Sequence, residues 1–99
     1  MRRTSVHPAG SDVRIDEGLA EERARALGRA GRRLEDALAA HQRAVAAHAT
    51  DAEIDAWLDA IAAALYRLLV QRECAGARHG NLEAIQAVYD LPPEAVRRV

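Results

Sequence analysis

The residues best suited to chemistry gather in one polar stretch beside an apolar helical segment. Its members are Arg72, Glu73, Arg78, His79 and Asn81. A glycine-flanked loop that leads into a helix can bind an anion through free backbone amides and the helix dipole, and arginines add charge-assisted hydrogen bonds. We therefore expect these five residues to form a binding site for a small anionic ligand. The alternative is that Arg72 and Glu73 only tie the helix junction together by ion pairs.

Histidine and cysteine give little support for a metal site or a nucleophile. His41 and His48 are seven residues apart, whereas two metal ligands on one helix face stand four apart. Cys74 is the single cysteine, so one chain cannot form an internal disulfide or a thiolate metal cluster. Because the C-terminal end of a helix disfavours a thiolate, we expect Cys74 to be a small, buried hydrophobic residue.

The sequence lacks the residue arrangements that are typical of enzymes. It has no nucleophile–base pair, no paired catalytic carboxylates and no phosphate-binding loop. Catalysis is therefore the function class with the least support. We expect a protein that is not an enzyme, with no catalytic residues, no metal and no cofactor.

Two charged faces are expected on the long helices. The acidic face repeats every four residues, at Asp51, Asp55 and Asp59, and Arg43 is its expected partner. The basic stripe consists of Arg25, Arg29, Arg32 and Arg33. Such a stripe either binds phosphate or acidic groups, or is a solvated face supported by glutamates one turn away.

The spacing of apolar residues in the C-terminal segment, residues 85–98, is similar to that of a helix-turn-helix. DNA binding, or a regulatory accessory role, is therefore an alternative function. Two features argue against it: the second helix would end at Val99, too short to fill a major groove, and Asp90 stands in the turn where glycine is common. The net charge of −1 also lacks the basic excess of a nucleic-acid binder.

A pair of short motifs covers part of the same region. Residues 70–78 read Val-Gln-Arg-Glu-x-x-Gly-x-Arg, and residues 93–96 read Pro-Glu-Ala-Val. With these motifs the chain resembles, over residues 61–98, a group of short bacterial all-helical proteins of unknown function. The resemblance implies no activity, substrate or cofactor, and it draws attention to residues of the polar stretch described above.

The long elements that must position these residues follow from the spacing of apolar side chains. One helix is expected from about residues 12–16 to about residue 48. A bend or break near Gly28 and Gly31 is the alternative to the favoured continuous helix, in which these glycines allow a second helix to approach closely. A second helix begins after Thr50, because Thr50 and Glu53 form a capping box. Its apolar residues follow a period of 3.6 residues over five turns.

The remaining elements are short. Asn81 is the expected N-cap of a third helix, whose inner face is Leu82, Ile85, Val88 and Tyr89. Two prolines then end this helix and begin a last helical turn. The predicted fold is all-α, a long antiparallel two-helix hairpin plus a short C-terminal helical pair. Residues 1–12 are expected to be a disordered leader, and residues 13–99 a single helical domain.

The composition predicts a thin core that is completed by dimerisation. Hydrophobic residues make up 49% of the 99 residues, but 23 of them are alanine and none is phenylalanine. Because a chain this short with such a core is marginally stable alone, we expect a homodimer. The candidate interface residues are Leu19, Leu27, Trp57, Tyr66, Leu69 and Val70. The preferred function is a non-catalytic helical protein that self-associates through helices one and two, and another protein remains a possible partner.

Origin and location are inferred from residue usage. All fourteen basic residues are arginine, which with the many alanines suggests a GC-rich bacterial genome. The basic start is followed by no apolar run of signal-peptide length, and the longest apolar run, residues 61–66, is far short of a membrane span. We expect a cytoplasmic protein that binds neither membrane nor nucleic acid.

Overall fold

Four helices and the loops between them make up the described part of the chain. The computed structural model describes the backbone of residues 9–99 and the side chains from residue 17 onward. Its elements are α1 (Ala9–Ala46), α2 (Asp51–Cys74), α3 (Asn81–Val88) and α4 (Pro93–Val96). Over these residues no strand occurs, which confirms the all-α class. The expected leader lies, for residues 1–8, outside the described residues.

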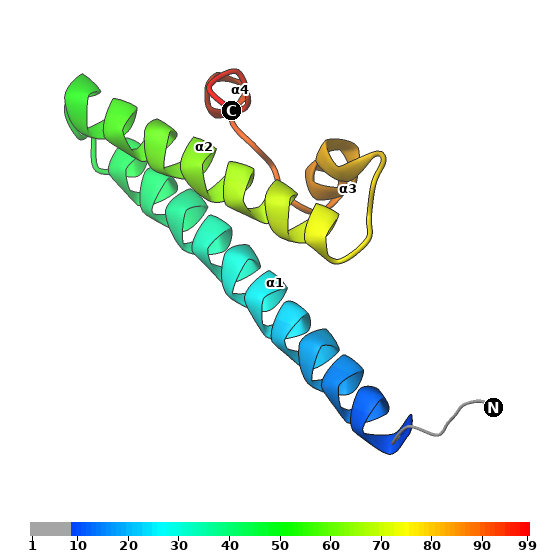
Figure 1. Cartoon of the computed structure of the whole chain (residues 1–99). Coiled ribbons are helices and arrows are strands. Elements are labelled where there is room, and N and C mark those ends of the chain that lie inside the picture. The colour runs from blue at the N-terminus through cyan, green and yellow to red at the C-terminus, as the bar shows by residue number, and fades with distance from the viewer. Residues whose placement is uncertain (1–8) are drawn as a thin grey trace.

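The two long helices form the expected antiparallel hairpin (Figure 1). α1 is one continuous helix of 38 residues, so Gly28 and Gly31 do not interrupt it. It begins at Ala9, before the range in which the sequence placed its start. Its end is fixed by His48, whose backbone takes a positive φ of 55° and turns the chain towards α2.

The start of α2 is fixed by the capping box that the sequence predicts. The Glu53 amide donates to Thr50 Oγ1 at 3.1 Å, and the Thr50 amide donates to Glu53 Oε1 at 3.3 Å. These bonds satisfy two of the amides that a helix N-terminus leaves without intrahelical partners. The turn between α1 and α2 is therefore set by local chemistry.

The core lies where α1, α2 and the two short helices meet. Leu34, Ile61 and Leu65 are its fully enclosed large side chains, each 0% exposed. Six of the twelve buried apolar residues are alanines, so the core is as thin as the composition predicts. Alanines at the contact allow the two long helices to approach closely, and each contributes little buried area.

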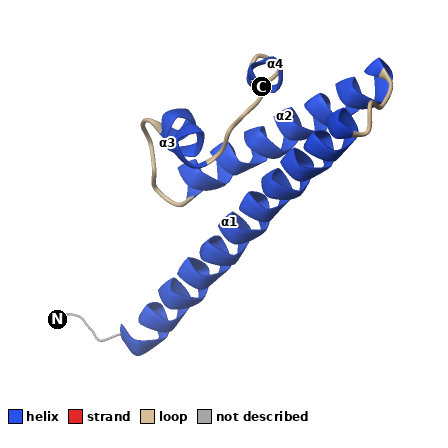
Figure 2. Cartoon of the chain, turned by 180° about the vertical axis from the view of Figure 1, so that it is seen from behind, coloured by secondary structure: helices blue, strands red, loops and turns tan. Residues whose placement is uncertain are grey.

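α3 and α4 both pack on α2 but do not contact each other, as Figure 2 shows from behind. Each buries one small face, through Ile85 in α3 and Ala95 in α4. The residues between them, 89–92, are not helical and carry the chain along α2. Residues 85–98 are therefore not packed as a helix-turn-helix, the arrangement on which the DNA-binding alternative depends.

Two expectations for α3 also need correction. The N-cap is Gly80, with a left-handed φ of 67°, and Asn81 is instead the first helical residue and is buried. Val88, expected on the inner face, is 73% exposed, because it is the last residue of α3 and the chain becomes extended at Tyr89. Leu82 and Tyr89 do pack against the core.

α1 continues well beyond the C-terminal end of α2, as its blue half in Figure 1 shows. α1 has 38 residues and α2 has 24, and at about 1.5 Å per residue this difference in length corresponds to about 21 Å of helix. Residues 17–25 are all exposed, and Ala26 is the first half-buried residue. We call residues 9–25 the α1 extension. It makes the molecule elongated, with extents of 69 × 22 × 19 Å.

Candidate functional site

The polar stretch at residues 72–81 forms the junction between α2 and α3. Arg72 Nε donates to Asn81 Oδ1 at 2.9 Å, and Asn81 Nδ2 donates to the Ala77 carbonyl at 2.8 Å. These bonds hold the loop against the end of α2 and satisfy the buried amide of Asn81. The junction is thus tied by a hydrogen-bond chain from Arg72, whereas the sequence offered an ion pair with Glu73 as the alternative.

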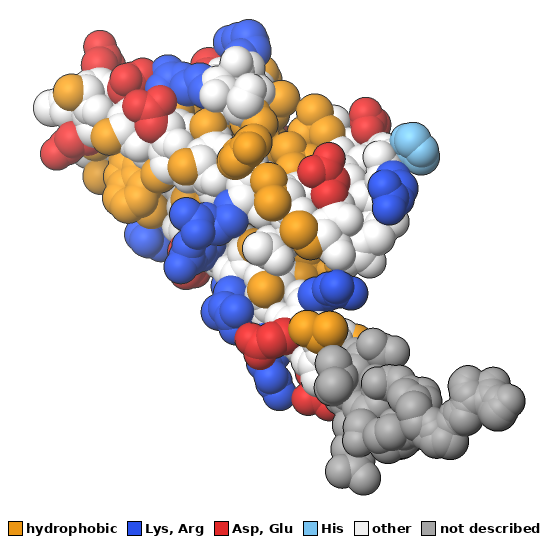
Figure 3. All heavy atoms as spheres, in the orientation of Figure 1, with side chains coloured by type: hydrophobic (Ala, Val, Ile, Leu, Met, Phe, Trp, Pro, Cys, Tyr) orange, Lys and Arg blue, Asp and Glu red, His pale blue; other side chains and the backbone are white. Residues whose placement is uncertain are grey.

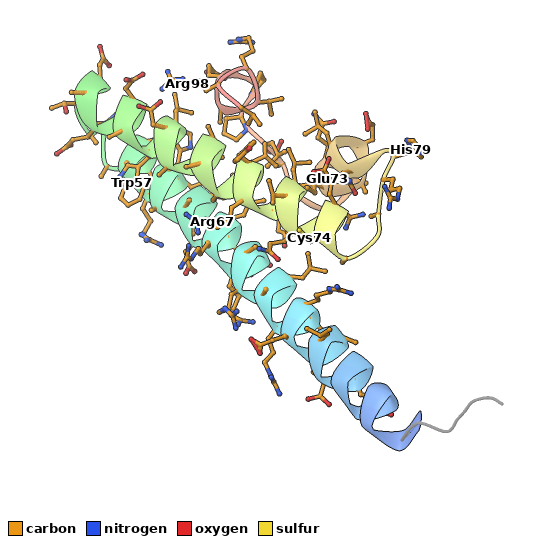
Figure 4. The ribbon with its side chains drawn as sticks, viewed as in Figure 1. Trp57, Arg67, Glu73, Cys74, His79 and Arg98 are labelled. Carbon is orange, nitrogen blue, oxygen red and sulfur yellow. The ribbon has the colours of Figure 1, made fainter. Side chains whose placement is uncertain are left out.

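The other members of this stretch project from the loop and the end of α2. Glu73, Arg78 and His79 are exposed, and Figure 4 shows Glu73 and His79 near the C-terminal end of α2. Cys74 is exposed as well, so the expectation that it is buried is wrong. It is the last residue of α2. The structure brings Arg72 and Asn81 together, and the anion site remains a prediction.

The acidic face of α2 has a different partner from the one expected. Arg98, just after α4, donates to Asp55 Oδ1 at 2.6 Å and to Asp59 Oδ1 at 2.7 Å, and also to the Asp55 carbonyl at 3.2 Å. The hydrogen bond that Asp55 accepts, followed by the one that Asp59 accepts, raises the pKa of the Arg98 guanidinium above its ordinary value. Arg43 lies instead on the open side of the hairpin. Arg98 therefore fastens the C-terminus to α2 (Figure 4).

A second bond joins the C-terminal segment to α1. The Tyr89 hydroxyl donates to Glu35 Oε2 at 2.6 Å. This hydrogen bond, together with partial burial and the negative charge of Glu35, raises the pKa of Tyr89 above its ordinary value. The phenol and the carboxylate hold the end of α3 against the hairpin, which is a structural role.

The most developed concave surface is a groove between α1 and α2. Three neighbouring hollows share lining residues along it, and the central one has a volume of about 530 Å³. The lining residues are Ala26, Arg29, Ala30, Arg33, Asp36, Ala37, Ala40, Arg43, Ala44, Ala49, Glu53, Ala56, Trp57, Ala60, Ala63, Ala64, Arg67 and Gln71. None of them comes from α3 or α4, so this face of the hairpin is open. We call this surface the α1–α2 groove.

Alanines form the floor of the α1–α2 groove and longer side chains form its rim. Trp57 lines both the central and the outer hollow and is 39% exposed. Arg29, Arg33, Arg43 and Arg67 stand along the rim, and none of the four forms an ion pair with another described side chain. Figure 4 shows Trp57 and Arg67 on the side of α2 that faces α1, and in Figure 3 basic side chains gather along that boundary.

The six candidate interface residues do not lie on one face. Trp57 is in the α1–α2 groove, whereas Tyr66, 61% exposed, lines a different hollow beside Arg98. Leu27 and Leu69 pack against the core, and Val70 is half-buried. Leu19, 48% exposed, stands on the α1 extension.

Sequence reasoning did not single out the groove itself. Its floor is built from alanines spaced three and four apart on both helices, for example Ala37, Ala40, Ala60 and Ala64. That spacing is the signal that could have identified it, since two such rows leave a depression wherever two helices lie side by side. Arg67 was missed as well.

Within the part of the chain that the structure describes, no three His, Cys, Asp or Glu side chains lie close enough to hold a metal ion. The described helices include none that is long and apolar enough to cross a membrane.

Comparison of the chain with protein-family models, curated proteins and solved structures found no match.

Proposed function

We propose that this protein is a non-catalytic helical assembly module that self-associates, as a homodimer, through α1 and α2. The α1–α2 groove is the observation that carries this proposal. Its floor is apolar, its rim holds a half-exposed tryptophan and four arginines, and neither α3 nor α4 covers it. Tryptophan and arginine at the edge of an apolar depression are the residues that contribute most at protein interfaces.

The thin core gives this proposal independent support. α3 and α4 pack on one side of the hairpin, whereas the floor of the groove on its open side is formed by alanine side chains. A second copy packed against that face would remove further apolar surface from water, at about 25 cal/mol for each Å². Closed two-fold dimers are by far the commonest soluble homo-oligomers.

The two alternative functions have weaker support from the described residues. DNA binding through the C-terminus would need Arg98, which is already held by Asp55 and Asp59. Anion binding at the α2–α3 junction would need Arg72, whose Nε is already bonded to Asn81. DNA would have to displace the bonds of Arg98, whereas an anion at the junction would have only the terminal guanidinium nitrogens of Arg72 available.

The sole tryptophan provides a direct test. Because Trp57 lies in the groove, self-association through that surface should shift its fluorescence emission to shorter wavelength as protein concentration rises. Over the same range, light scattering on a sizing column should report a mass that increases from 10.8 kDa to twice that value.

A matched pair of variants separates the groove from the rest of the surface. Ala63 is exposed and lines the groove, whereas Ala87 is exposed on α3. Ala63→Glu should keep the protein monomeric, and Ala87→Glu should behave like the wild type. A wild-type mass that stays at 10.8 kDa at every concentration, with an unchanged emission maximum, would overturn the proposal.

A further inference from the structure

Among the described side chains, those of residues 17–25 in the α1 extension are all exposed, and neither α3 nor α4 contributes to the lining of the α1–α2 groove. We propose that, in the dimer, the α1 extension of each copy lies antiparallel in the groove of the other copy. This inference rests on the self-association proposed above and specifies its geometry. Three independent features of the two surfaces support it: their apolar faces, their charges and their lengths.

Leu19 of the extension lies on the same face of α1 as residues that line the groove. Leu19 stands seven residues before Ala26, and Arg33 stands seven residues after it, so all three lie on one face of α1. Leu19 is 48% exposed on a solitary helix, where nothing else in the described chain covers it. A leucine of this kind fits a floor of alanines such as Ala30 and Ala37, because their small side chains leave room for it.

The charges of the two surfaces are complementary. Residues 9–25 contain five acidic residues and three arginines, a net charge of −2. The residues that line the groove include four arginines and two acidic residues, a net charge of +2. At the end of the groove nearest the extension, Arg29, Arg33 and Arg67 line one hollow without an acidic residue among its lining residues.

One glutamate of the extension is placed to meet these arginines. Glu22 lies four residues before Ala26 and seven before Arg29, on the face of α1 that the groove shares. In an antiparallel pair of α1 helices that cross near residues 24–27, Glu22 of one copy comes beside Arg29 and Arg33 of the other. Glu21, its neighbour, points about 100° away from that face.

The lengths match and the arrangement closes on itself. The extension has seventeen residues, or about 25 Å of helix, and the groove follows α1 from Ala26 to Ala44, or about 27 Å. The extension and the α1 side of the groove are consecutive parts of one helix. If a two-fold axis passes beside the boundary between them, each extension lies in the groove of the other copy, and both grooves are filled at once. Such an isologous contact leaves no free end, so the assembly stops at two copies.

Charge reversal in the full-length chain tests this geometry. Glu22→Arg, and separately the double change Arg29→Glu/Arg33→Glu, should each weaken the dimer about ten-fold or more, because like charges then meet in both grooves. An equimolar mixture of the two variants should recover a dimer of near wild-type affinity, since each extension then meets a groove of opposite charge. Leu19→Glu should weaken the dimer at least ten-fold.

Glu21→Arg is the matched control. Arg25 forms an ion pair with Glu21 at 3.2 Å and with Glu22 at 3.4 Å, so both variants lose one equivalent contact within α1. Glu21→Arg should leave the dimer dissociation constant within about two-fold of the wild type. Circular dichroism of each variant should show unchanged helix content, because all these side chains are exposed.

The outcomes separate this inference from the proposal on which it rests. A wild-type dimer that Glu22→Arg and Glu21→Arg affect equally, with no recovery in the mixture, would overturn the exchange of extensions and leave self-association standing. A wild-type chain that stays monomeric up to high concentration would overturn both. Selective weakening by Glu22→Arg and Leu19→Glu, with recovery in the mixture, supports both.

Discussion

Single enclosed side chains matter more than usual in this protein because so few of them are large. Leu34, Ile61 and Leu65 are the fully enclosed ones, and alanines make up half of the buried apolar residues. When a leucine is truncated, alanine neighbours cannot move to fill the space, since they have no side-chain rotamers. The cavity left by such a substitution should therefore stay open, and its contribution to the loss of unfolding free energy should be large.

We expect Leu65→Ala to lower the free energy of unfolding by about 2–5 kcal/mol. Urea unfolding followed by circular dichroism measures this loss. Val88→Ala is the control, because Val88 is 73% exposed and its truncation should change stability by less than about 0.5 kcal/mol. Similar losses for the two variants would show that Leu65 is not enclosed.

The Tyr89–Glu35 bond predicts a dependence on alkaline pH. Since the pKa of Tyr89 is raised in the folded chain, its neutral form is favoured by folding. This contribution to stability is fully present below the ordinary tyrosine value of about 10 and is lost as the pH rises through the higher folded value. In a Tyr66→Phe background, where Tyr89 is the only tyrosine, absorbance at alkaline pH should show titration at a lower pH after Glu35→Gln. An unchanged titration would mean that Glu35 is not the cause.

At the scale of the elements, local and tertiary contacts hold different helices. α2 begins at a complete capping box and needs no other element to define its first turn. α4 has only four residues, which is too short to be stable alone, and depends on buried Ala95 and on the Arg98 ion pairs. α4 is therefore stable only when it is packed on the hairpin.

The capping box should be measurable by substitution. Thr50→Ala removes the oxygen that accepts from the Glu53 amide, and should cost about 1 kcal/mol of unfolding free energy. Thr50→Ser keeps that oxygen and should retain most of the stability. Thermal unfolding of the two variants gives the comparison, and equal losses would contradict a capping role for the hydroxyl.

At the scale of the whole molecule, stability is uneven along α1. Residues 30–40 pack against α2, whereas residues 17–25 stand free. An isolated helix of that length is marginal in water, so its hydrogen bonds should open often in the single chain.

Hydrogen exchange should reveal this difference. At concentrations where the chain is monomeric, amides of residues 19–25 should exchange much faster than those of residues 30–40, because only the latter are closed by a second helix. At higher concentration, the dimer in which each α1 extension lies in the groove of the other copy should slow the exchange of the amides of residues 19–25. Equal protection of both segments in the monomer would show that the extension is held within the single chain.

The interactions that are local in sequence are the ones that the sequence predicted. The hairpin, its turn and the capping box at Thr50 and Glu53 depend on periodicity and on residues three positions apart, so they could be inferred without coordinates. Continuity through Gly28 and Gly31 was also predicted, since a glycine weakens a helix by only about 1 kcal/mol.

Contacts between distant residues were decided only by the tertiary structure. The path of residues 89–92 along α2 places Arg98, rather than Arg43, beside the acidic face. The same path separates α3 from α4 and leaves one side of the hairpin open as the groove. Asn81 gains its bond to Arg72 because the loop folds back on α2. Composition and spacing do not encode these paths, because each depends on how a loop closes and on which exposed face it reaches.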